Sequence, residues 1–449
     1  GEAMNDYQSF VASKSQLGGM HGFNPTFMPE KLFDYQSYLV DWAVRKGRAA
    51  IFADCGMGKT FMQLAWAQNI VEREAKPVLI LAPLMVSVQT VEEAGLIGVE
   101  ASRKMGTDIV VTNYERMHQF DPDDFAGVVC DESSILKNFD GAYRTAVTEF
   151  MRRMKYRLLC SATPSPNDYT ELGTSSEALG HLGHMDMLSM FFKNDEDSLH
   201  PMSMGSAWRF KSHAENDFWR WLVSWARAVR KPSDIGFDDG DMVLPELIER
   251  TVTLESGALA GSLFAMPARN LEEERQERRA SVTQRCEAAA ELLSNKGVGV
   301  GWCHFNSEAD LLEKLIPGAK QISGSDDDDK KEETFLAFKR GEISHLVTKP
   351  KIAAYGINWQ HCDFMTTFAD HSYEQYYQAV RRFWRYGQKN PVEAVTVTTQ
   401  NLSGMTRNRA SKSEKAERMF SKIIANMNDE ITLERFKEHH AKQEIPSWL

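Results

Sequence analysis

The 449-residue sequence lacks several features that mark whole classes of protein. It contains no run of about 18 apolar residues, which excludes an ordinary transmembrane helix. Its first residues show neither the basic stretch nor the apolar stretch of a secretory leader, so we expect a cytoplasmic protein with no membrane partner. The six cysteines form no CxxC pair, and most lie in or beside apolar runs, which favours free thiols over a disulfide framework.

The sequence also lacks an excess of positive charge. Against 63 Asp and Glu residues stand 52 Lys and Arg residues, which gives a net charge of −11. This balance argues against a protein that simply coats nucleic acid, although it does not exclude a local basic groove. With 42% hydrophobic and 26% charged residues, the composition is that of a globular protein. A chain of this length is expected to form about two to four domains.

Short apolar runs alternate with longer amphipathic segments, and this alternation predicts α/β domains built on parallel sheets. In the first part of the chain we expect strands at residues 49–53, 78–82, 109–112, 127–131 and 157–161. The alternation stops near Gly173, where a segment rich in Met, Trp and Phe begins, and it resumes after residue 243. In the second part we expect strands at residues 298–305, 321–323, 345–348, 364–368 and 394–398.

These patterns predict two α/β lobes with a helical insertion between them and a helical C-terminal tail. The expected divisions are an N-terminal extension at 1–30, a first lobe at 31–172, the insertion at 173–242, a second lobe at 243–400 and the tail at 401–449.

A phosphate-binding loop follows the first expected strand. Residues 53–60 have the sequence ADCGMGKT and precede an expected helix, which is the GxxxxGK[ST] pattern with alanine in place of its first glycine. Glycines allow backbone N–H groups to surround a triphosphate, Lys59 can reach the β and γ phosphates, and Thr60 can ligate magnesium. No NKxD-like sequence is present, which disfavours a small GTPase.

A pair of carboxylates ends another expected strand, in the sequence CDESS at residues 130–134. At the end of a parallel strand beside a phosphate loop, Asp131 can hold magnesium and Glu132 can orient or deprotonate the attacking water. An Asp-Glu pair alone more often forms a solvated turn, so this interpretation depends on the preceding phosphate loop.

A group of arginines lies near the end of the second lobe, in the sequence QAVRRFWRYGQ at residues 378–388. On a helix, Gln378, Arg382 and Arg385 would project from one face. Such a face could supply arginine fingers to a nucleotide, or it could contact nucleic-acid phosphates from the surface. The spacing alone does not decide between these two roles.

Read in order, ten segments of this sequence resemble the motifs of superfamily-two helicases. The DESSILKN and RYGQ forms are similar to the Swi/Snf branch, and the compact size is most similar to its phage and bacterial members. The segments are Tyr35-Gln36, DCGMGKT (54–60), LAPLMVSVQT (81–90), TNYE (112–115), DESSILKN (131–138), SATP (161–164), GWCHFNSE (301–308), ISGS (322–325), AAYGIN (353–358) and QAVRRFWRYGQ (378–388).

The resemblance implies two RecA-like lobes that bind ATP with Mg2+. Gln36 would recognise adenine, while Ser161 and Thr163 would couple hydrolysis to lobe movement. Ser134 stands where the family usually has a histidine that contributes to this coupling. The implied nucleotide-binding residues are Gln36, Asp54, Gly56, Met57, Gly58, Lys59, Thr60 and Gly356. The implied catalytic residues are Lys59, Asp131, Glu132, Gln378, Arg382 and Arg385, with Thr60 and Asp131 holding the metal.

The same resemblance implies a nucleic-acid partner, which we expect to be double-stranded DNA. The implied contacts to its backbone are Ser87, Thr112, Asn306, Gly324 and Thr348. The expected function is a DNA-dependent ATPase that translocates along the duplex as ATP drives closure of its two lobes. A strand-separating DNA or RNA helicase and an ATP-gated nucleic-acid clamp remain as alternatives. A phage-encoded member would act in the host cytoplasm, and the sequence identifies no protein partner.

Two further patterns have a structural and a functional interpretation. The insertion contains a cluster of aromatic residues: Trp208, Phe210, Phe218, Trp219, Trp221 and Trp225. Phe218, Trp221 or Leu222, and Trp225 have helical spacing, which favours core packing over stacking on nucleic-acid bases. His181 and His184 form an HxxH pair, but no further ligand has metal-site spacing, so zinc is the minority interpretation.

Overall fold

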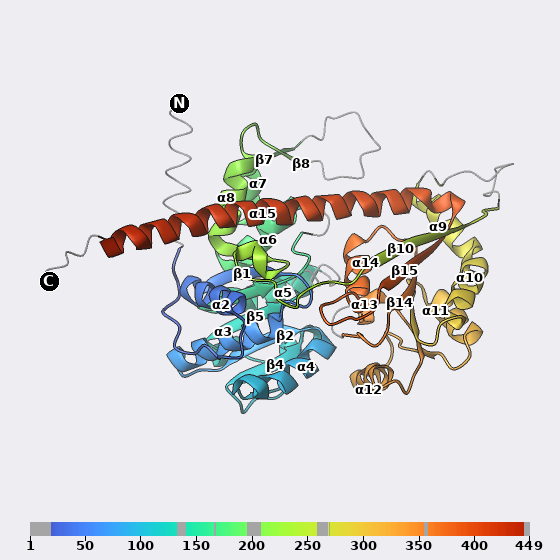
Figure 1. Ribbon diagram of the computed structural model, residues 1–449, viewed down its shortest axis with the longest axis horizontal. Coiled ribbons are helices and arrows are strands. Elements are labelled where there is room, and N and C mark those ends of the chain that lie inside the picture. The colour runs from blue at the N-terminus through green and yellow to red at the C-terminus, as the bar shows by residue number, and fades with distance from the viewer. Residues whose placement is uncertain are drawn as a thin grey trace. The chain divides into compact units, whose positions relative to one another are not determined.

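The computed structural model describes residues 19–132, 141–165, 168–194, 208–257, 268, 270–353 and 358–443. Within these residues the chain forms two compact units. Unit 1 comprises Gly1–Ala82, Ser87–Asp239 and Lys415–Leu449, and unit 2 comprises Pro83–Val86 and Gly240–Glu414, in each case as far as the residues are described. Each unit contains its own parallel sheet (Figure 1).

The sheet of unit 1 has seven strands in the order β3-β4-β2-β5-β6-β1-β9, and its neighbouring strands pair in parallel. Strands such as VLILA and GVVCD are buried along their whole length, as expected for a parallel sheet covered on both faces. The strands are β1 (Arg48–Ala53), β2 (Val78–Ala82), β3 (Ala101–Ser102), β4 (Ile109–Asn113), β5 (Gly127–Asp131), β6 (Tyr156–Cys160) and β9 (Ala226–Val229).

Helices α2 and α3 of unit 1 pack against each other and bury apolar faces that include Leu39, Val40, Leu64 and Trp66. The helices of the first part of the chain are α2 (Asp34–Lys46), α3 (Lys59–Glu74), α4 (Leu84–Ala94), α5 (Gly141–Arg152), α6 (Leu172–Leu179), α7 (His184–Phe191) and α8 (Glu215–Trp225). Short 3-10 turns lie at Gly95–Ile97, Tyr114–Gln119, Pro122–Asp124, Tyr169–Glu171 and Pro232–Ile235.

The insertion, predicted at residues 173–242, contains α7 and α8, together with an antiparallel pair formed by β7 (Phe192–Asn194) and β8 (Trp208–Phe210). Its aromatic side chains pack on one another, and Trp219, Trp221 and Trp225 are at most 8% exposed. The core-packing interpretation is therefore confirmed for these three residues. The segment also supplies β9, a strand that the sequence did not predict, which pairs with the phosphate-loop strand β1.

The sheet of unit 2 has six strands in the order β10-β15-β14-β11-β13-β12, again in parallel pairs. Successive residues of a strand point to opposite faces, and Leu346 and Val347 accordingly join two different apolar cores. The strands are β10 (Leu247–Leu254), β11 (Gly299–Trp302), β12 (Lys320–Gln321), β13 (His345–Thr348), β14 (Phe364–Phe368) and β15 (Val392–Thr399).

The two cores of unit 2 lie under different pairs of helices. One core contains side chains of α12 (Asp328–Lys339) and α14 (Tyr373–Val380), including Phe338 and Val380. The other contains side chains of α10 (Val282–Ser294) and α11 (Asn306–Leu315), including Leu293 and Leu312. The remaining elements of unit 2 are α9 (Leu271–Ala280), α13 (Pro350–Ala353) and a 3-10 turn at Gln400–Leu402.

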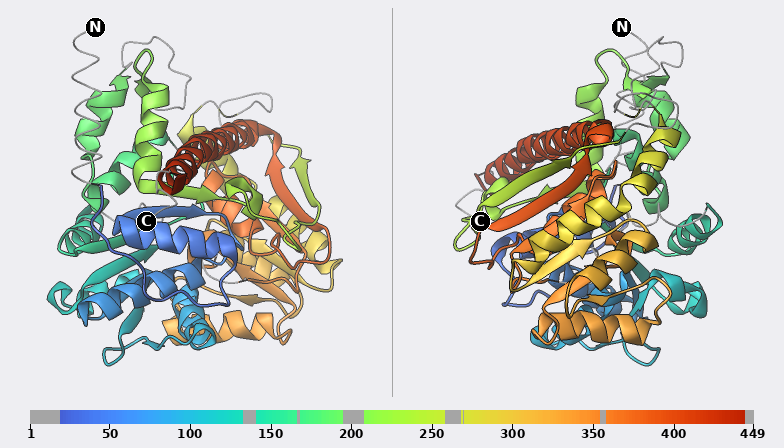
Figure 2. Two further views of the ribbon diagram at one scale, coloured as in Figure 1. Left: turned by 60° about the vertical axis from the view of Figure 1, so that its left-hand side comes forward. Right: turned by 90° about the vertical axis from the view of Figure 1, so that its right-hand side faces the viewer.

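The tail forms a single helix, α15 (Ser403–Gln443), drawn in red in Figures 1 and 2. Its residues up to Glu414 belong to unit 2, and those from Lys415 onward belong to unit 1. Within unit 1, Glu417 pairs with Arg230 at 2.7 Å and Met419 packs beside Ser165. In the part of the chain that the structure describes, no helix combines the length and apolarity needed to cross a membrane.

The strand topology confirms two α/β lobes built on parallel sheets, and the tail is helical as predicted. The segment predicted as a helical insertion contains α7 and α8 but also β7, β8 and β9. All five expected strands of the first lobe lie within one residue of the observed strand at both ends, and all five of the second lobe do so at one end or both. Helices α9 and α10 are separate elements, because Ser281 lies between them with φ and ψ of −101° and 5°.

Candidate functional site

The phosphate loop joins β1 to α3 in unit 1. Gly56 and Gly58 have φ values of +83° and +75°, a region that side chains other than glycine rarely adopt. A Cβ atom on Gly58 would lie 2.1 Å from Nε2 of Gln36, so this position also lacks the space for a side chain. The backbone N–H of Asp54 donates to Val229 of β9 at 2.9 Å, and therefore the insertion holds the start of the loop.

Two residues of α2 hold the phosphate loop by hydrogen bonds. The Tyr35 hydroxyl and the Gln36 amide both donate to the Met57 carbonyl, at 2.8 and 3.1 Å. The side-chain oxygen of Gln36 accepts from the backbone N–H of Phe33 at 2.9 Å. Phe33 is 59% exposed and stacks on Tyr35, with ring centroids 6.0 Å apart. The structure thus places Gln36 beside the phosphate loop, and its recognition of adenine stays a prediction.

The carboxylates Asp131 and Glu132 lie at the carboxyl end of β5 and are buried at 3% and 4% exposure. The Lys59 ammonium donates to the Glu132 carboxylate in a short ion pair. Glu132 has a φ of +48°, which costs a non-glycine residue of the order of 1 kcal/mol. The chain tolerates this conformation at the residue predicted to act on the attacking water. Strained backbone of this kind is often found at functional sites.

Two residues that the sequence analysis did not identify hold this end of β5. Gln63 of α3 is fully buried, and its amide donates to Oδ1 of Asp131 at 2.8 Å. The Tyr114 hydroxyl donates to the backbone carbonyl of Asp131 at 2.6 Å. Gln63 lies one helical turn after Lys59, and that spacing was the available signal. The role of Tyr114 depends on a contact between distant segments, for which the sequence holds no signal.

Burial and nearby charge set the protonation of this cluster. Burial raises the pKa of Asp131 to about 6, although Lys59 acts in the opposite direction. Burial alone would lower the pKa of Lys59, but the neighbouring Glu132 and Asp131 raise it above its ordinary value. Lys59 is therefore a cation at neutral pH, and it faces two carboxylates.

These residues fit a nucleotide with magnesium. The Thr60 hydroxyl and the Asp131 carboxylate are oxygen donors of the kind that Mg2+ prefers. The side-chain oxygen of Gln63 is buried without a hydrogen-bond partner, which leaves an acceptor beside Asp131. The phosphate loop opens onto the N-terminus of the 16-residue helix α3, where backbone N–H groups favour an anion.

Ser161 and Thr163 follow β6, the strand between the phosphate-loop strand and the Asp131 strand. Both are buried, and the Ser161 hydroxyl accepts from the Thr163 backbone N–H at 3.0 Å. Ser134 lies outside the described residues, as does Gly356 of the second lobe.

In unit 2, the arginine segment is less helical than its spacing predicted. Helix α14 ends at Val380, so Arg382 and Arg385 lie beyond it and do not continue one helical face. The carbonyl of Arg382 accepts from the Trp359 backbone N–H at 2.8 Å, which withdraws it from the helical ladder. The Arg382 guanidinium is 5% exposed and donates to the backbone carbonyl of Gln378 at 3.1 Å. The roles of these residues stay predictions.

The five predicted nucleic-acid contacts differ in exposure. Ser87, Thr112 and Thr348 are at most 3% exposed, and the Thr348 hydroxyl donates to the Ile322 carbonyl at 3.3 Å. Asn306 and Gly324 are exposed. The structure describes all five positions, and of these five only Asn306 and Gly324 are exposed to solvent. As contacts to nucleic acid, all five stay predictions.

The two histidines of the HxxH pair have different surroundings. The His181 ring bonds to the Arg48 carbonyl at 2.9 Å and stacks near Trp225, while His184 begins α7. Burial, with added repulsion from Lys46, lowers the pKa of His181 to about 3. Among the described residues, no group of three or more His, Cys, Asp or Glu side chains is placed to hold a metal ion.

Comparison with known proteins finds similarity among solved structures. No protein-family model matches the chain, and no curated protein matches it. Among solved structures, it is similar to the Sulfolobus solfataricus SWI2/SNF2 ATPase core in complex with dsDNA, at 14% sequence identity and a TM-score of 0.39. The match covers 84% of this chain and 90% of that chain. No functional conclusion follows from similarity at this level, and the fold class stands on the strand order of the two sheets.

Proposed function

We propose that this protein is a DNA-dependent ATPase that uses ATP hydrolysis to translocate along double-stranded DNA. The observation that carries the proposal is the cluster around the phosphate loop, where Lys59 pairs with the buried Glu132 and Gln63 donates to Asp131. A buried cation opposite two carboxylates, at the open end of a glycine loop, matches the chemistry of phosphoryl transfer to water. The order of the sequence motifs supports duplex DNA as the partner.

In the proposed reaction, Lys59 leaves Glu132 and binds the β and γ phosphates of ATP. Glu132 is then released from its ion pair and can orient the attacking water and accept its proton. Thr60 and Asp131 would hold magnesium, which neutralises charge on the phosphates when bound. Gln36 would recognise the adenine base from its place beside Gly58. Before a nucleotide binds, the ion pair with Lys59 would keep the Glu132 carboxylate from acting as a base.

The second lobe would complete the ATPase. We assign to Arg382 and Arg385 the arginine-finger role that the family resemblance implies. Gln378 and a nucleotide contact at Gly356 would complete the site from the second lobe. Closure of the lobes on ATP and opening after hydrolysis would change the affinity for DNA, and such a difference can convert hydrolysis into movement. The exposed Asn306 and Gly324 are the proposed DNA contacts that need no rearrangement to reach a phosphate.

The test uses Lys59→Ala and Glu132→Gln, with Lys104→Ala as a matched control because Lys104 is exposed. We expect Lys59→Ala to abolish ATP turnover, since the phosphates lose their only cation from this loop. Glu132→Gln should still bind ATP and fail to hydrolyse it. The control should retain the wild-type rate.

The same experiment separates the alternatives. Wild-type turnover by Glu132→Gln would contradict the assigned base. ATP-dependent DNA binding with no turnover by the wild-type protein would instead favour an ATP-gated clamp. Separation of duplex strands by the active protein would favour a helicase over a translocase.

A further inference from the structure

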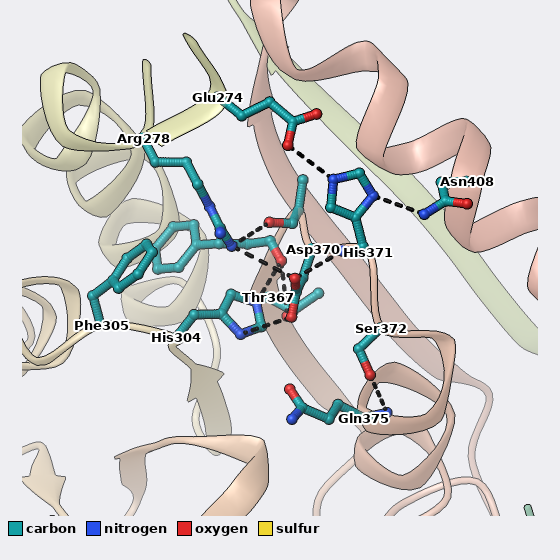
Figure 3. A network of polar contacts seen from close by, with 12 residues as sticks. Glu274, Arg278, His304, Phe305, Thr367, Asp370, His371, Ser372, Gln375 and Asn408 are labelled. Atoms are coloured by element: carbon teal, nitrogen blue, oxygen red, sulfur yellow. Dashed lines mark hydrogen bonds and ion pairs between the residues drawn. The ribbon is translucent and has the colours of Figure 1, made fainter. Parts of the chain in front are cut away.

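A network of polar contacts in unit 2 surrounds the four residues that connect β14 to α14, Ala369–Ser372. The His371 ring lies at its centre, between Glu274 of α9 and Asn408 of α15 (Figure 3). Its Nε2 is 2.9 Å from the Glu274 carboxylate, and its Nδ1 is 2.8 Å from the Asn408 amide nitrogen. A neutral ring with the proton on Nε2 satisfies both contacts, because Nε2 then donates to the carboxylate while Nδ1 accepts from the amide.

The first turns of α15 hold this connection in two further ways. The Lys412 ammonium donates to the backbone carbonyl of His371 at 3.0 Å. Met405 and Leu402 pack on Ala369 in a small apolar cluster. The helix therefore contacts the side chain and the backbone of His371, and its Met405 packs on Ala369 two residues earlier.

The opposite side of the connection is held by the body of unit 2. Arg278 of α9 donates to the Ala369 carbonyl at 3.1 Å, and His304 lies 3.5 Å from the Asp370 carboxylate. Burial acts to raise the pKa of Asp370, but His304 and Arg278 outweigh it and lower the pKa below its ordinary value. The ionised carboxylate accepts from the His371 backbone N–H at 2.7 Å. The connection is thus clamped between α9 and α15.

A second contact joins α15 to α14 itself. The Arg409 guanidinium lies 3.8 Å from the centroid of the Tyr376 ring, and it also donates to the Thr396 hydroxyl at 3.1 Å. The Tyr376 hydroxyl donates to the Glu249 carboxylate at 2.6 Å. Helix α15 therefore contacts both His371, two residues before α14 begins, and Tyr376 within α14.

The clamped connection leads directly to the arginines. Ser372 caps α14 by accepting from the Gln375 backbone N–H at 3.1 Å, and the helix has only eight residues before Arg381 and Arg382. A helix of this length spans roughly 12 Å, so a tilt at its first turn displaces the residues after its last turn. A misplacement of about 1 Å can reduce a catalytic rate about 100-fold.

We propose that the first turns of α15 form part of the ATPase machinery, with His371 as the positioning residue through which Asn408 and Lys412 set the placement of Gln378 and Arg382. This inference rests on the proposed function and extends it to an element outside the family motifs. The first turns of α15 would act on the rate of hydrolysis and not on the binding of ATP, because they belong to unit 2 and the phosphate loop belongs to unit 1.

The experiment measures steady-state ATP hydrolysis with duplex DNA for the full-length protein and for Asn408→Ala, Lys412→Ala and the double variant. Arg407→Ala is the matched control, because Arg407 lies in the same turn and is exposed. We expect the double variant to lower kcat about 10- to 100-fold while KM for ATP changes less than about twofold. The control should match the wild type, and the melting temperatures should lie close together.

A second comparison separates positioning from a general loss of structure. In an Arg382→Ala background, the double variant should lower kcat by a clearly smaller factor than in the wild type, since one of the two residues that α15 positions is already gone. An equal fall in both backgrounds, a rise in KM in place of a fall in kcat, or an unchanged kcat would each overturn the proposal. An inactive wild-type protein would overturn the proposed function itself and this inference with it.

Discussion

Gln63 is the side chain that most directly constrains the predicted metal carboxylate. Its amide donates to Asp131 at 2.8 Å, and this hydrogen bond lowers the pKa of Asp131 against the larger effect of burial, which raises it to about 6. A donor to the charged form of a carboxylate favours ionisation. Asp131 must be ionised to hold a metal cation, so Gln63 helps to keep the site competent near neutral pH.

We therefore expect Gln63→Leu to raise the pKa of Asp131 further. The acidic limb of the pH profile of ATP turnover, measured between about pH 5 and 8, should move to higher pH, because a larger fraction of Asp131 is protonated at each pH. Gln68→Leu, on the same helix and half-buried, is the matched control and should leave the profile in place. A profile that Gln63→Leu leaves unchanged would contradict this role.

At the scale of single residues, sequence motifs predicted which side chains lie near one another better than helical spacing did. The loop sequence predicted that Lys59, Asp131 and Glu132 would meet at one end of a sheet, and the structure brings Lys59 and Glu132 into contact. Their catalytic roles stay predictions. Tyr114 could not be found from the sequence, because its hydroxyl reaches the Asp131 carbonyl only after β4 and β5 are both placed in the sheet.

The pairing of α10 with α11 depends on a buried ion pair. Arg285 and Glu308 are 2% and 0% exposed at their side chains, and the Glu308 carboxylate also accepts from the backbone N–H groups of His304 and Phe305 at 2.9 and 3.0 Å. The network therefore joins the two helices and caps the start of α11. Removal of one partner would leave a buried guanidinium without its countercharge.

We expect Glu308→Ala to lower the free energy of unfolding by about 3 to 5 kcal/mol, as breaking a buried pair does. Urea unfolding at neutral pH measures this loss. Glu342→Ala removes one partner of the exposed pair between Arg340 and Glu342, and it should change stability too little to detect, because water screens that pair. If the two substitutions lowered the free energy of unfolding equally, burial would not determine how much these ion pairs contribute to stability.

At the scale of elements, strands were more predictable than helix ends. Apolar runs set the bounds of β2, β5, β13 and β14, which match their expected ranges. The end of α14 was not predictable from the sequence. Just beyond it, the backbone N–H of the distant Trp359 donates to the Arg382 carbonyl, which is then not available to a longer helix. Strand β9 escaped prediction since its four residues follow the Trp-rich helix α8 with no turn signal between them.

At the scale of the molecule, the helical tail was predictable and its division was not. Polar helical periodicity after residue 401 predicted the helix α15. Its assignment to both units depends on pairs between distant residues, such as Arg230 with Glu417 and His371 with Asn408, which the sequence does not reveal. The expected domain boundaries within the chain stay predictions.

The net charge of −11 bears on how the whole molecule would bind DNA. An acidic protein can bind DNA only where basic side chains gather, and each phosphate contact then releases counterions. The account therefore expects stimulation by DNA to weaken steeply between about 50 and 200 mM salt. Stimulation that does not vary over this range would count against a groove that follows phosphates.

The most direct test of the central claim is the steady-state rate of ATP hydrolysis, measured without nucleic acid and then with duplex DNA, single-stranded DNA, duplex RNA and single-stranded RNA. The account predicts strong stimulation by duplex DNA, lost in Lys59→Ala. Hydrolysis that no nucleic acid stimulates, or that only single strands stimulate, would contradict the proposal of an ATPase driven by duplex DNA.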